Sequence, residues 1–397
     1  MKRLQAYKFQ LLPNGAQQRS MTCYAGHARK VWNLSLAEQE RRYKAGEKFA
    51  SEFDMNQWLV EWKKQYPYLA HSPSQTLQQV MKHLAQAYKA FFKGDASHPV
   101  MKKKGRCAAS FRFPQGFRIE QDNHRIFLPK LGWIRYRCSR KIEGDVKNIT
   151  VSFSSGHWYA SIQTEREVDE PIPQATSAVG IDMGIARLAT LSDGSFLEPL
   201  NSFRKHEQRL ARYQRAMSRK KKFSKNWMKA KARVQKIQAR IGNVRRDYLH
   251  KATTIISKNH ALVVVEDLKI RNMSKSAAGT IEYPGRNVSA KSGLNKAILD
   301  QGWFEFRRQL KYKLAWNGGQ LIAVPPQYTS QSCPCCGHVS RDNRQTQAKF
   351  KCVDCGFAEH ADLVGAINIK AAGLAVLACG EAAQSGASVK QEPAEVT

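Results

Sequence analysis

The sequence predicts a multidomain α+β protein, and three observations lead to that prediction. Short runs that alternate apolar and polar residues fill positions 108–165, as antiparallel strands do. From residue 177 onward, strand-like and helix-like patterns alternate, as in an α/β domain. Five of the nine cysteines lie within 23 residues, between Cys333 and Cys355. At 397 residues, the chain is long enough for two or three domains.

The amino-terminal part is predicted to be one strand followed by helices. The strand spans residues 4–12 and ends at the turn signal Pro13-Asn14-Gly15. Residues 16–93 have helical character, and Ser72-Pro73-Ser74 is predicted to cap a helix. Apolar residues at helical spacing predict a packing face there: Leu77, Met81, Leu84, Tyr88 and Phe91. We expect the opening strand to join the later β region across this helical insertion.

Basic and aromatic residues interleave on the predicted strands of the β region. They are Arg112, Phe113, Arg118, Arg135, Tyr136 and Arg137. In a β-barrel, such a surface suits a nucleic-acid backbone whose bases stack on the rings. Packing of the same rings in a core is an equally good interpretation for any one of them.

The second half of the chain follows a Pro-rich linker at residues 170–173. Two apolar runs then meet around Asp182, and Asp193-Gly194 is a hairpin signal. Residues 201–250 are predicted to form long basic helices. Further on, HALVVVEDL predicts a buried strand, residues 292–316 a helix, and QLIAVP another short buried strand.

Charge identifies the class of partner. The chain has 65 Lys and Arg against 32 Asp and Glu, a net charge of +33. Residues 201–250 alone hold 17 basic and 2 acidic residues, so the local excess is 17 − 2 = +15. Nucleic acid is the expected partner, since a polyanion screens such an excess and a small acidic substrate does not require it. We expect a soluble, cytoplasmic protein, because neither a signal peptide nor a stretch of about 20 apolar residues is evident.

Two C-x2-C pairs predict a structural zinc site. Cys333 and Cys336 form the first pair, Cys352 and Cys355 the second, and 15 residues separate them. Four thiolates on two tight turns give the closed tetrahedral cage of structural zinc. A glycine follows each pair, where such a turn needs an unusual backbone conformation. Cys335 is expected to be a bystander, and the site is expected to fasten a small β-ribbon.

Three carboxylates in apolar surroundings predict a second metal site. Asp182 lies in an apolar strand, Glu266 near the end of another, and Asp362 opens a short helix after the cysteines. Each alone is more often a turn or cap residue, and Glu266 cannot be distinguished from Asp267 by pattern. Together they match the need of two Mg²⁺ ions for several anionic oxygens. With so basic a chain, a metal-dependent nuclease becomes the leading hypothesis.

Six motifs follow one another along residues 176–370: GIDMGIARLATLSDG, VVVEDLKIRNM, SGLNKAILDQGWFEFRRQLKYK, YTSQSCPCCGH, NRQTQAKFKCVDCG and ADLVGAINIK. In sequence and in order they resemble the signatures of the TnpB (OrfB) family of transposon-encoded, RNA-guided DNA endonucleases, relatives of type V CRISPR effectors. YKFQLLPNGAQQ and VWNLSLAEQ are similar to the less specific start of the family, so the resemblance covers nearly the whole chain. One departure is Val364-Gly365-Ala366, where the family commonly has Asn-Ala-Ala; Asn368 remains.

The resemblance implies an architecture and a set of site residues. The implied parts are a wedge β-barrel (1–12 and 100–172), a helical recognition domain (13–99), a RuvC-like nuclease domain of RNase H fold (173–330 and 359–379), a zinc-bearing insertion that binds target nucleic acid (331–358) and a disordered tail (380–397). Asp182, Glu266 and Asp362 are implied to be catalytic and to hold Mg²⁺, and Arg344 is a candidate assistant. Residues 271–293 are predicted, with equal weight, to be a mobile lid over the site or a passive loop.

The resemblance also implies the partners. A guide RNA from the transposon end would direct one protein molecule to double-stranded DNA beside a short motif, and both strands would be cut. Base pairing would read the target while the protein reads the flanking motif. Alternatives are an RNA-guided DNA-binding protein that does not cut and a protein that assists or performs transposition.

Overall fold

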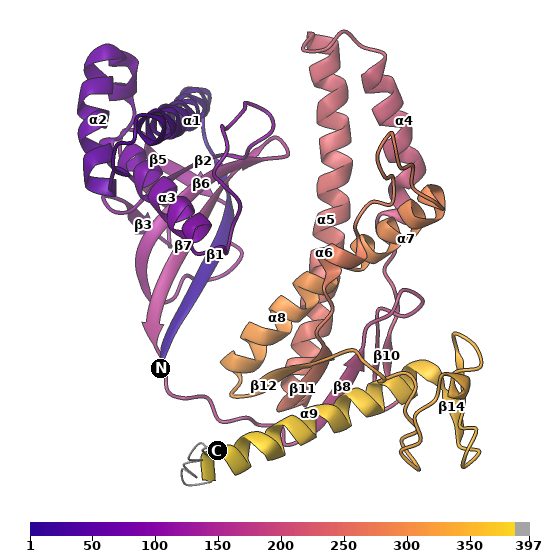
Figure 1. The fold of residues 1–397 in the computed structure, drawn as a ribbon. Helices are drawn as coiled ribbons and strands as arrows, with labels where there is room; N and C mark the ends of the chain where they lie inside the picture. The colour runs from indigo at the N-terminus through magenta and orange to yellow at the C-terminus, as the bar shows by residue number, and fades with distance from the viewer. Residues whose placement is uncertain (386–397) are drawn as a thin grey trace, which may run out of the picture. The chain divides into compact units, whose positions relative to one another are not determined.

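A computed structural model describes the backbone of residues 1–385 and the side chains of residues 1–379. The chain divides into two compact units, Met1–Asp169 and the segment from Glu170 onward (Figure 1). The boundary lies at the start of the Pro-rich segment that was expected to be a linker. Each unit has its own apolar core and is described by itself below.

The first unit contains a seven-stranded antiparallel sheet in the order β2-β6-β7-β1-β5-β4-β3. Its strands are β1 (Lys2–Leu12), β2 (Ala109–Phe113), β3 (Arg118–Glu120), β4 (Arg125–Leu128), β5 (Gly132–Tyr136), β6 (Asp145–Ser154) and β7 (His157–Glu167). The opening strand β1 lies between β7 and β5, so the expected pairing across the helical insertion is confirmed. Phe113 and Tyr136 are buried in the sheet's core, so for these two rings the packing interpretation is right.

The insertion consists of α1 (Gly15–Lys44), α2 (Glu52–Gln65), the 3₁₀ turn η1 (Pro67–His71) and α3 (Ser74–Phe92). Leu77, Met81 and Leu84 of α3 are fully buried against α1 and α2, as the helical spacing predicted. Both predicted boundaries are right, since β1 ends at Leu12 and α3 begins at Ser74, but the local contacts differ from the expectation. The Pro13-Asn14-Gly15 signal is a helix start: the Asn14 side chain accepts from Gln17 N, and the Gln17 side chain accepts from Asn14 N. Ser72 does not cap α3 but contacts His27 Nδ1 at 2.8 Å.

The second unit contains a five-stranded sheet in the order β10-β9-β8-β11-β12. Its strands are β8 (Ala178–Asp182), β9 (Ala189–Leu191), β10 (Phe196–Leu197), β11 (Leu262–Glu266) and β12 (Gln320–Val324). β8, β11 and β12 are parallel, whereas β9 and β10 are antiparallel and turn at the predicted Asp193-Gly194 hairpin. The unit's helices are α4 (Glu207–Ser218), α5 (Lys225–Asn259), α6 (Ile270–Met273), α7 (Val288–Gln301), α8 (Trp303–Trp316) and α9 (Ala361–Ser385), with a 3₁₀ turn η2 (Arg204–His206) before α4.

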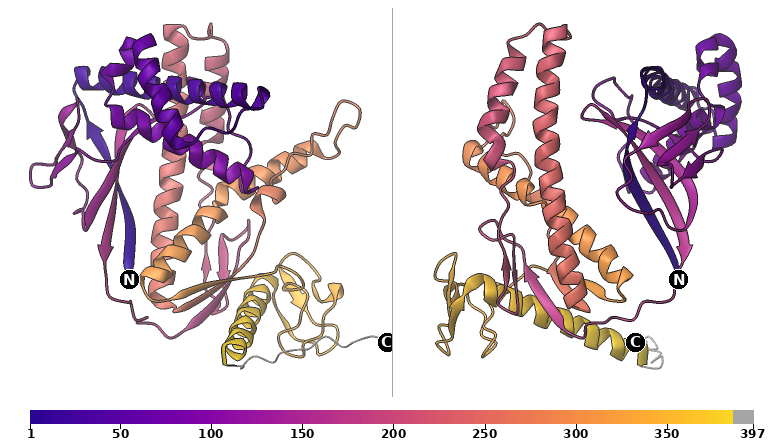
Figure 2. Two further views of the ribbon diagram at one scale, coloured as in Figure 1. Left: turned by 60° about the vertical axis from the view of Figure 1, so that its left-hand side comes forward. Right: turned by 180° about the vertical axis from the view of Figure 1, so that it is seen from behind.

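Helices cover both faces of this sheet (Figure 2). Val263 and Val265 of β11 pack with α5 and α8, whereas Val264 points the other way and packs with Ile369 of α9. This alternation explains the near-continuous apolar run of β11, because both sides of a central parallel strand are buried. The basic segment forms the hairpin of α4 and α5, whose small core contains Leu210 and Val234.

The helix expected over residues 292–316 is two helices. α7 ends and α8 begins at Gly302, which has a φ of +75°. A Cβ at Gly302 would also lie 3.2 Å from Leu249 Cδ1 of α5, so the bend brings the backbone close to that helix. In the segment 271–293, the end of α6 and the start of α7 are helical, and the connection between them exposes Ile281 and Tyr283.

Helix α9 differs from two expectations. It continues to Ser385, so it is not the short helix that was expected. It also includes the first residues of the tail predicted at 380–397, and the remainder of that tail lies outside the described residues. Its segment Ala361–Cys379 is long and apolar enough to cross a membrane by length and composition alone, which the search for apolar stretches missed. This is weak evidence of a span, because a helix that packs on a sheet passes the same test.

Candidate active site and cysteine cluster

Three elements of the second unit bring the predicted carboxylates together. Asp182 and Glu266 are the last residues of β8 and β11, which pair in parallel with Ile181 opposite Val265. Neighbouring parallel strands end at the same sheet edge, so both side chains lie there. Asp362 is in the first turn of α9, the helix that packs on β8.

Electrostatics shows how closely these groups interact. Burial, and then the negative charges of Glu266 and Asp362, raise the pKa of Asp182 from its usual 3.8 to about 7, although Arg344 opposes the change. Burial also raises the pKa of Glu266, against the effects of a hydrogen bond from Thr329 and the charge of Arg344. The site therefore gathers anions that repel one another and one nearby guanidinium.

The structure distinguishes Glu266 from Asp267. Glu266 is partly buried beside the other carboxylates, whereas Asp267 is exposed and accepts a hydrogen bond from Arg307 Nη1 at 2.6 Å. That ion pair lowers the pKa of Asp267. Side chains alternate between the faces of an extended chain, and the register of β11 decides which of the two joins the site.

Two polar residues that the carboxylate pattern did not identify position Glu266. Thr329 Oγ1 donates to Glu266 Oε1 at 2.8 Å. Asn368 of α9 donates through Nδ2 to the carbonyl oxygens of Thr329 and Ser332, both at 2.8 Å. Asn368 thereby ties α9 to the loop that carries Thr329. No periodicity marks Thr329, and Asn368 belongs to the motif ADLVGAINIK, which by itself predicts no contact for it.

The departure at Val364-Gly365-Ala366 lies directly at the site. A Cβ at Gly365 would be 3.1 Å from Asp182 Oδ2, which is tighter than an ordinary contact. Glycine therefore lets the first turns of α9 approach Asp182. His360, just before α9, has its Nδ1 3.9 Å from Asp362 Oδ2 and is a further neighbour that the sequence did not indicate.

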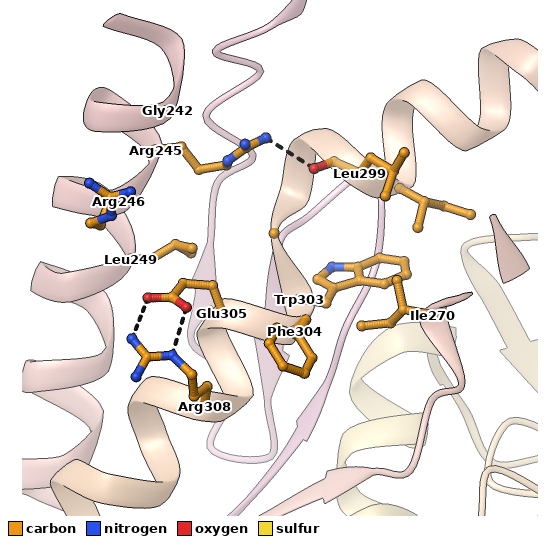
Figure 3. A pocket seen from close by; sticks show the side chains of 12 residues that line it. Gly242, Arg245, Arg246, Leu249, Ile270, Leu299, Trp303, Phe304, Glu305 and Arg308 are labelled. Atoms are coloured by element: carbon orange, nitrogen blue, oxygen red, sulfur yellow. Dashed lines mark hydrogen bonds and ion pairs between the residues drawn. The ribbon is translucent and has the colours of Figure 1, made fainter. Parts of the chain in front are cut away.

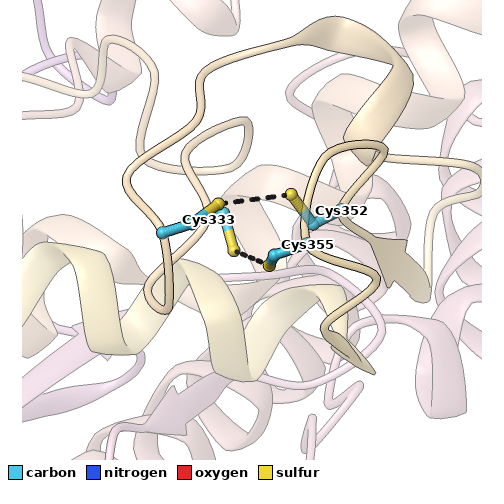
Figure 4. Close-up of side chains that lie close together, drawn as sticks. Cys333, Cys352 and Cys355 are labelled. Carbon is cyan, nitrogen blue, oxygen red and sulfur yellow. Dashed lines mark hydrogen bonds between the residues drawn. The ribbon is translucent and has the colours of Figure 1, made fainter.

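The four predicted zinc cysteines form one cluster (Figure 4). All four Sγ atoms lie within 4.8 Å of one another, and the Cys333–Cys355 and Cys336–Cys352 pairs are 3.6 Å apart. Zinc–sulfur bonds of about 2.3 Å in a tetrahedron place sulfurs about 3.8 Å apart, so the donor set fits zinc. Cys335 is exposed and lies outside the cluster, as expected.

The two turns of the cluster have the same geometry. Gly337 and Gly356 have φ values of +78° and +74°, as the sequence predicted for these positions. Gly337 N donates to Cys333 O and Gly356 N to Cys352 O. Strands β13 (Lys349–Lys351) and β14 (Ala358–His360) form the expected ribbon.

A buried asparagine that the sequence analysis missed joins the two turns. Asn343 is fully buried, and its Nδ2 donates to Gln331 O and His338 O beside the first cysteine pair. Its Oδ1 accepts from Val353 N, between the second pair, at 3.0 Å. Arg344 is the next residue, so the cluster's fold also places that cation beside the carboxylates.

Comparisons with known families match three parts of the chain. Residues 161–277 match the family described as "Probable transposase" (OrfB, IS605), and residues 303–369 match the Cas12f1-like TNB domain. Residues 1–48 match a family described as a helix-turn-helix domain, although here they form β1 and the single helix α1.

Full-length relatives are similar over almost the entire chain. The chain is 58% identical to the "Putative RNA-guided DNA endonuclease InsQ" of Escherichia coli K12, covering 100% of this chain and 99% of that protein. It is 32% identical to a "Putative RNA-guided DNA endonuclease" of Streptomyces pristinaespiralis, covering 99% and 97%. A solved Cas12f1–sgRNA–target DNA complex contains a chain of similar fold, with a TM-score of 0.55 at 12% identity, over 93% of this chain and 99% of that one.

Proposed function

The chain belongs to the TnpB (OrfB) family, and from this premise we propose that it is an RNA-guided DNA endonuclease. The observation that carries the proposal is the convergence of Asp182, Glu266 and Asp362 from two strands and a helix. Nuclease relatives over its full length and a net charge of +33 support it. The substrate would be double-stranded DNA that is complementary to a bound guide RNA and lies beside a short motif.

We assign Mg²⁺ to the three carboxylates on the chemistry of the donors. Hard anionic oxygens are the ligands that Mg²⁺ prefers. With a pKa near 7, Asp182 is only partly ionised at neutral pH, and a bound cation would make it fully ionised by offsetting the charges of Glu266 and Asp362. Within residues 1–379, Asp182 forms no ion pair. When bound, a pair of such ions would activate water and stabilise the leaving oxygen of a phosphodiester.

The chain's own residues would position the carboxylates and neutralise the negative charge of the reacting phosphate. The parallel strands hold Asp182 beside Glu266, and the hydrogen bond from Thr329 to one oxygen of Glu266 would leave the other oxygen to bind a cation. Arg344 would stabilise the negative charge that develops on the phosphate, as its effect on both pKa values suggests.

The division of the chain supports a domain assignment that we also propose. The seven-stranded sheet would be the wedge barrel (1–12 and 100–172), and its helical insertion (13–99) the recognition domain. Residues 173–330 and 359–379 would form the RuvC-like nuclease domain, and residues 331–358 the zinc-bearing insertion. A five-stranded sheet with a parallel half and an antiparallel half suits an RNase H fold. The protein would act in the prokaryotic cytoplasm, on nucleoid DNA.

A programmed-cleavage assay tests the proposal. The protein is purified with its RNA, the guide segment is rewritten, and plasmids with matched or unmatched targets beside a randomised flank are incubated with Mg²⁺. We expect only the matched plasmid to be cut, and Asp182→Ala to abolish cutting while RNA binding stays. Binding of the matched plasmid without a cut would favour an RNA-guided binder, joined strands would favour a transposition role, and equal cutting of both plasmids would refute RNA guidance.

A further inference from the structure

A cavity lies in the second unit, and none of the carboxylate site's residues lines it (Figure 3). Its volume is about 580 Å³, within the usual range of about 300–1,000 Å³ for small-ligand pockets. Helix α5 forms one wall, and the junction of α7 and α8 forms the other. The lining that matters here combines three cations, one carboxylate and two aromatic rings: Arg245, Arg246, Arg308, Glu305, Trp303 and Phe304.

The bend at Gly302 creates this combination. The positive φ of Gly302 ends α7 and starts α8 at once, so Trp303 and Phe304 stand in the first turn of α8, on the side of Ile270, whereas Glu305 and Arg308 lie toward α5 (Figure 3). Trp303 is only 4% exposed, whereas Phe304 is 71% exposed. One ring is therefore built into the wall and the other is presented to solvent at the rim.

The indole N–H of Trp303 points to a missing ligand. Its Nε1 atom is buried and finds no hydrogen-bond acceptor among the residues that the structure describes. A buried donor without an acceptor is costly, and native proteins rarely keep one. Because Trp303 lines the cavity, a ligand bound there can supply the acceptor.

The cations of the cavity are not equally available. Arg308 forms a two-point ion pair with Glu305, and Arg245 donates to the carbonyl oxygens of Leu299 and Asp300. Arg246 has one weak contact in the described structure, 3.5 Å from its Nη1 to Asn243 Oδ1. An anionic group entering the cavity would therefore pair first with Arg246.

We propose that this cavity binds one unpaired nucleotide of a nucleic-acid strand that runs along the basic helices α4 and α5. The base stacks on Phe304, a base acceptor takes the hydrogen bond of Trp303 Nε1, and Arg246 pairs with the adjoining phosphate. An exposed aromatic ring beside a cation is the pairing that single-strand binding sites use. The inference rests on the proposed function, since it assumes that guide RNA and target DNA are bound. The shared chemistry, a base joined to a phosphate, fits either strand.

Photo-crosslinking identifies the strand. The protein is purified with RNA from cells fed 4-thiouridine, and separately assembled with target DNA that contains 4-thiothymidine. After irradiation, mass spectrometry maps the crosslinked peptides. A crosslink to the peptide with Trp303 and Phe304 in the RNA arm assigns the cavity to RNA, and one in the DNA arm assigns it to DNA. If neither arm crosslinks there although the complex still cuts its target, the cavity proposal fails and the proposed function stands; loss of all nucleic-acid binding would contradict the proposed function itself.

Three variants separate binding from folding. Trp303→Phe keeps the buried ring and removes only the N–H, so we expect unchanged stability but about 2- to 10-fold weaker binding of the crosslinked strand. Phe304→Ala is expected to weaken binding about 5- to 100-fold, and Phe304→Leu to restore little of it, because a leucine cannot stack. Lys251→Ala, which removes one exposed charge from the same helix, is the control for Arg246→Ala. Equal binding by Trp303→Phe and wild type, or equal losses for the two charge variants, would overturn the assignment.

Discussion

Replacing Asp182 by Asn should stabilise the second unit in the absence of Mg²⁺. In the folded protein the pKa of Asp182 is about 7, whereas in the unfolded chain it is near 3.8. Stability therefore falls as pH rises from about 4 to 7, and the whole cost is present above pH 7. At about 1.36 kcal/mol per pH unit, the difference amounts to about 4 kcal/mol, which is a ceiling because the neighbouring carboxylates also relax.

Hydrogen exchange of the β8 and β11 amides measures this locally. In Mg²⁺-free buffer at pH 7.5, we expect Asp182→Asn to exchange more slowly than wild type, and at pH 4 the two to be nearly equal. Adding Mg²⁺ at pH 7.5 should protect wild type more than the variant, because binding to the folded state alone adds stability. If the variant were no better protected than wild type at pH 7.5, burial and the neighbouring carboxylates would not raise the pKa of Asp182 in the folded protein, and the reasoning would be refuted.

Three further predictions concern the residues around the site. Cys336→Ser should lower the zinc content and the folded yield, whereas Cys335→Ser should change neither; zinc analysis of both proteins decides. Asn343→Ala removes the donor of Gln331 O and His338 O, which each keep another backbone donor, and the acceptor of Val353 N, which has no other within the described residues. We therefore expect about 1–3 kcal/mol of lost stability and faster zinc release to a chelator, and equal release rates would contradict its role. Asn368→Ala frees the loop that carries Thr329, the hydrogen-bond partner of Glu266. Single-turnover cleavage should therefore slow about 10-fold or more, with little change in target binding. A loss of binding alone would place Asn368 outside the active site.

Local patterns predicted much of the fold because they depend on short-range rules. The alternation at residues 108–165 and the apolar run ending at Glu266 gave the right element types. Where local signals compete, context decided: Asn14 was predicted to form a turn, but a reciprocal pair of hydrogen bonds with Gln17 starts a helix there. The sequence also predicted one helix across Gly302, where the structure has two, because the spacing of apolar residues does not reveal that this residue has a positive φ.

The sequence by itself determined the chemistry of this protein: a strongly basic chain, two cysteine pairs with zinc spacing, and carboxylates set in apolar strands, because charge and ligand type are properties of the residues alone. Only the tertiary structure decided which groups meet. The register of β11 separated Glu266 from Asp267, and the packing of α9 brought Gly365 against Asp182. The bend between α7 and α8 forms a cavity lined by Trp303, whose indole N–H has no acceptor within the described part of the chain. These contacts join residues far apart in the chain, and their geometry depends on how whole elements pack, which no local pattern encodes.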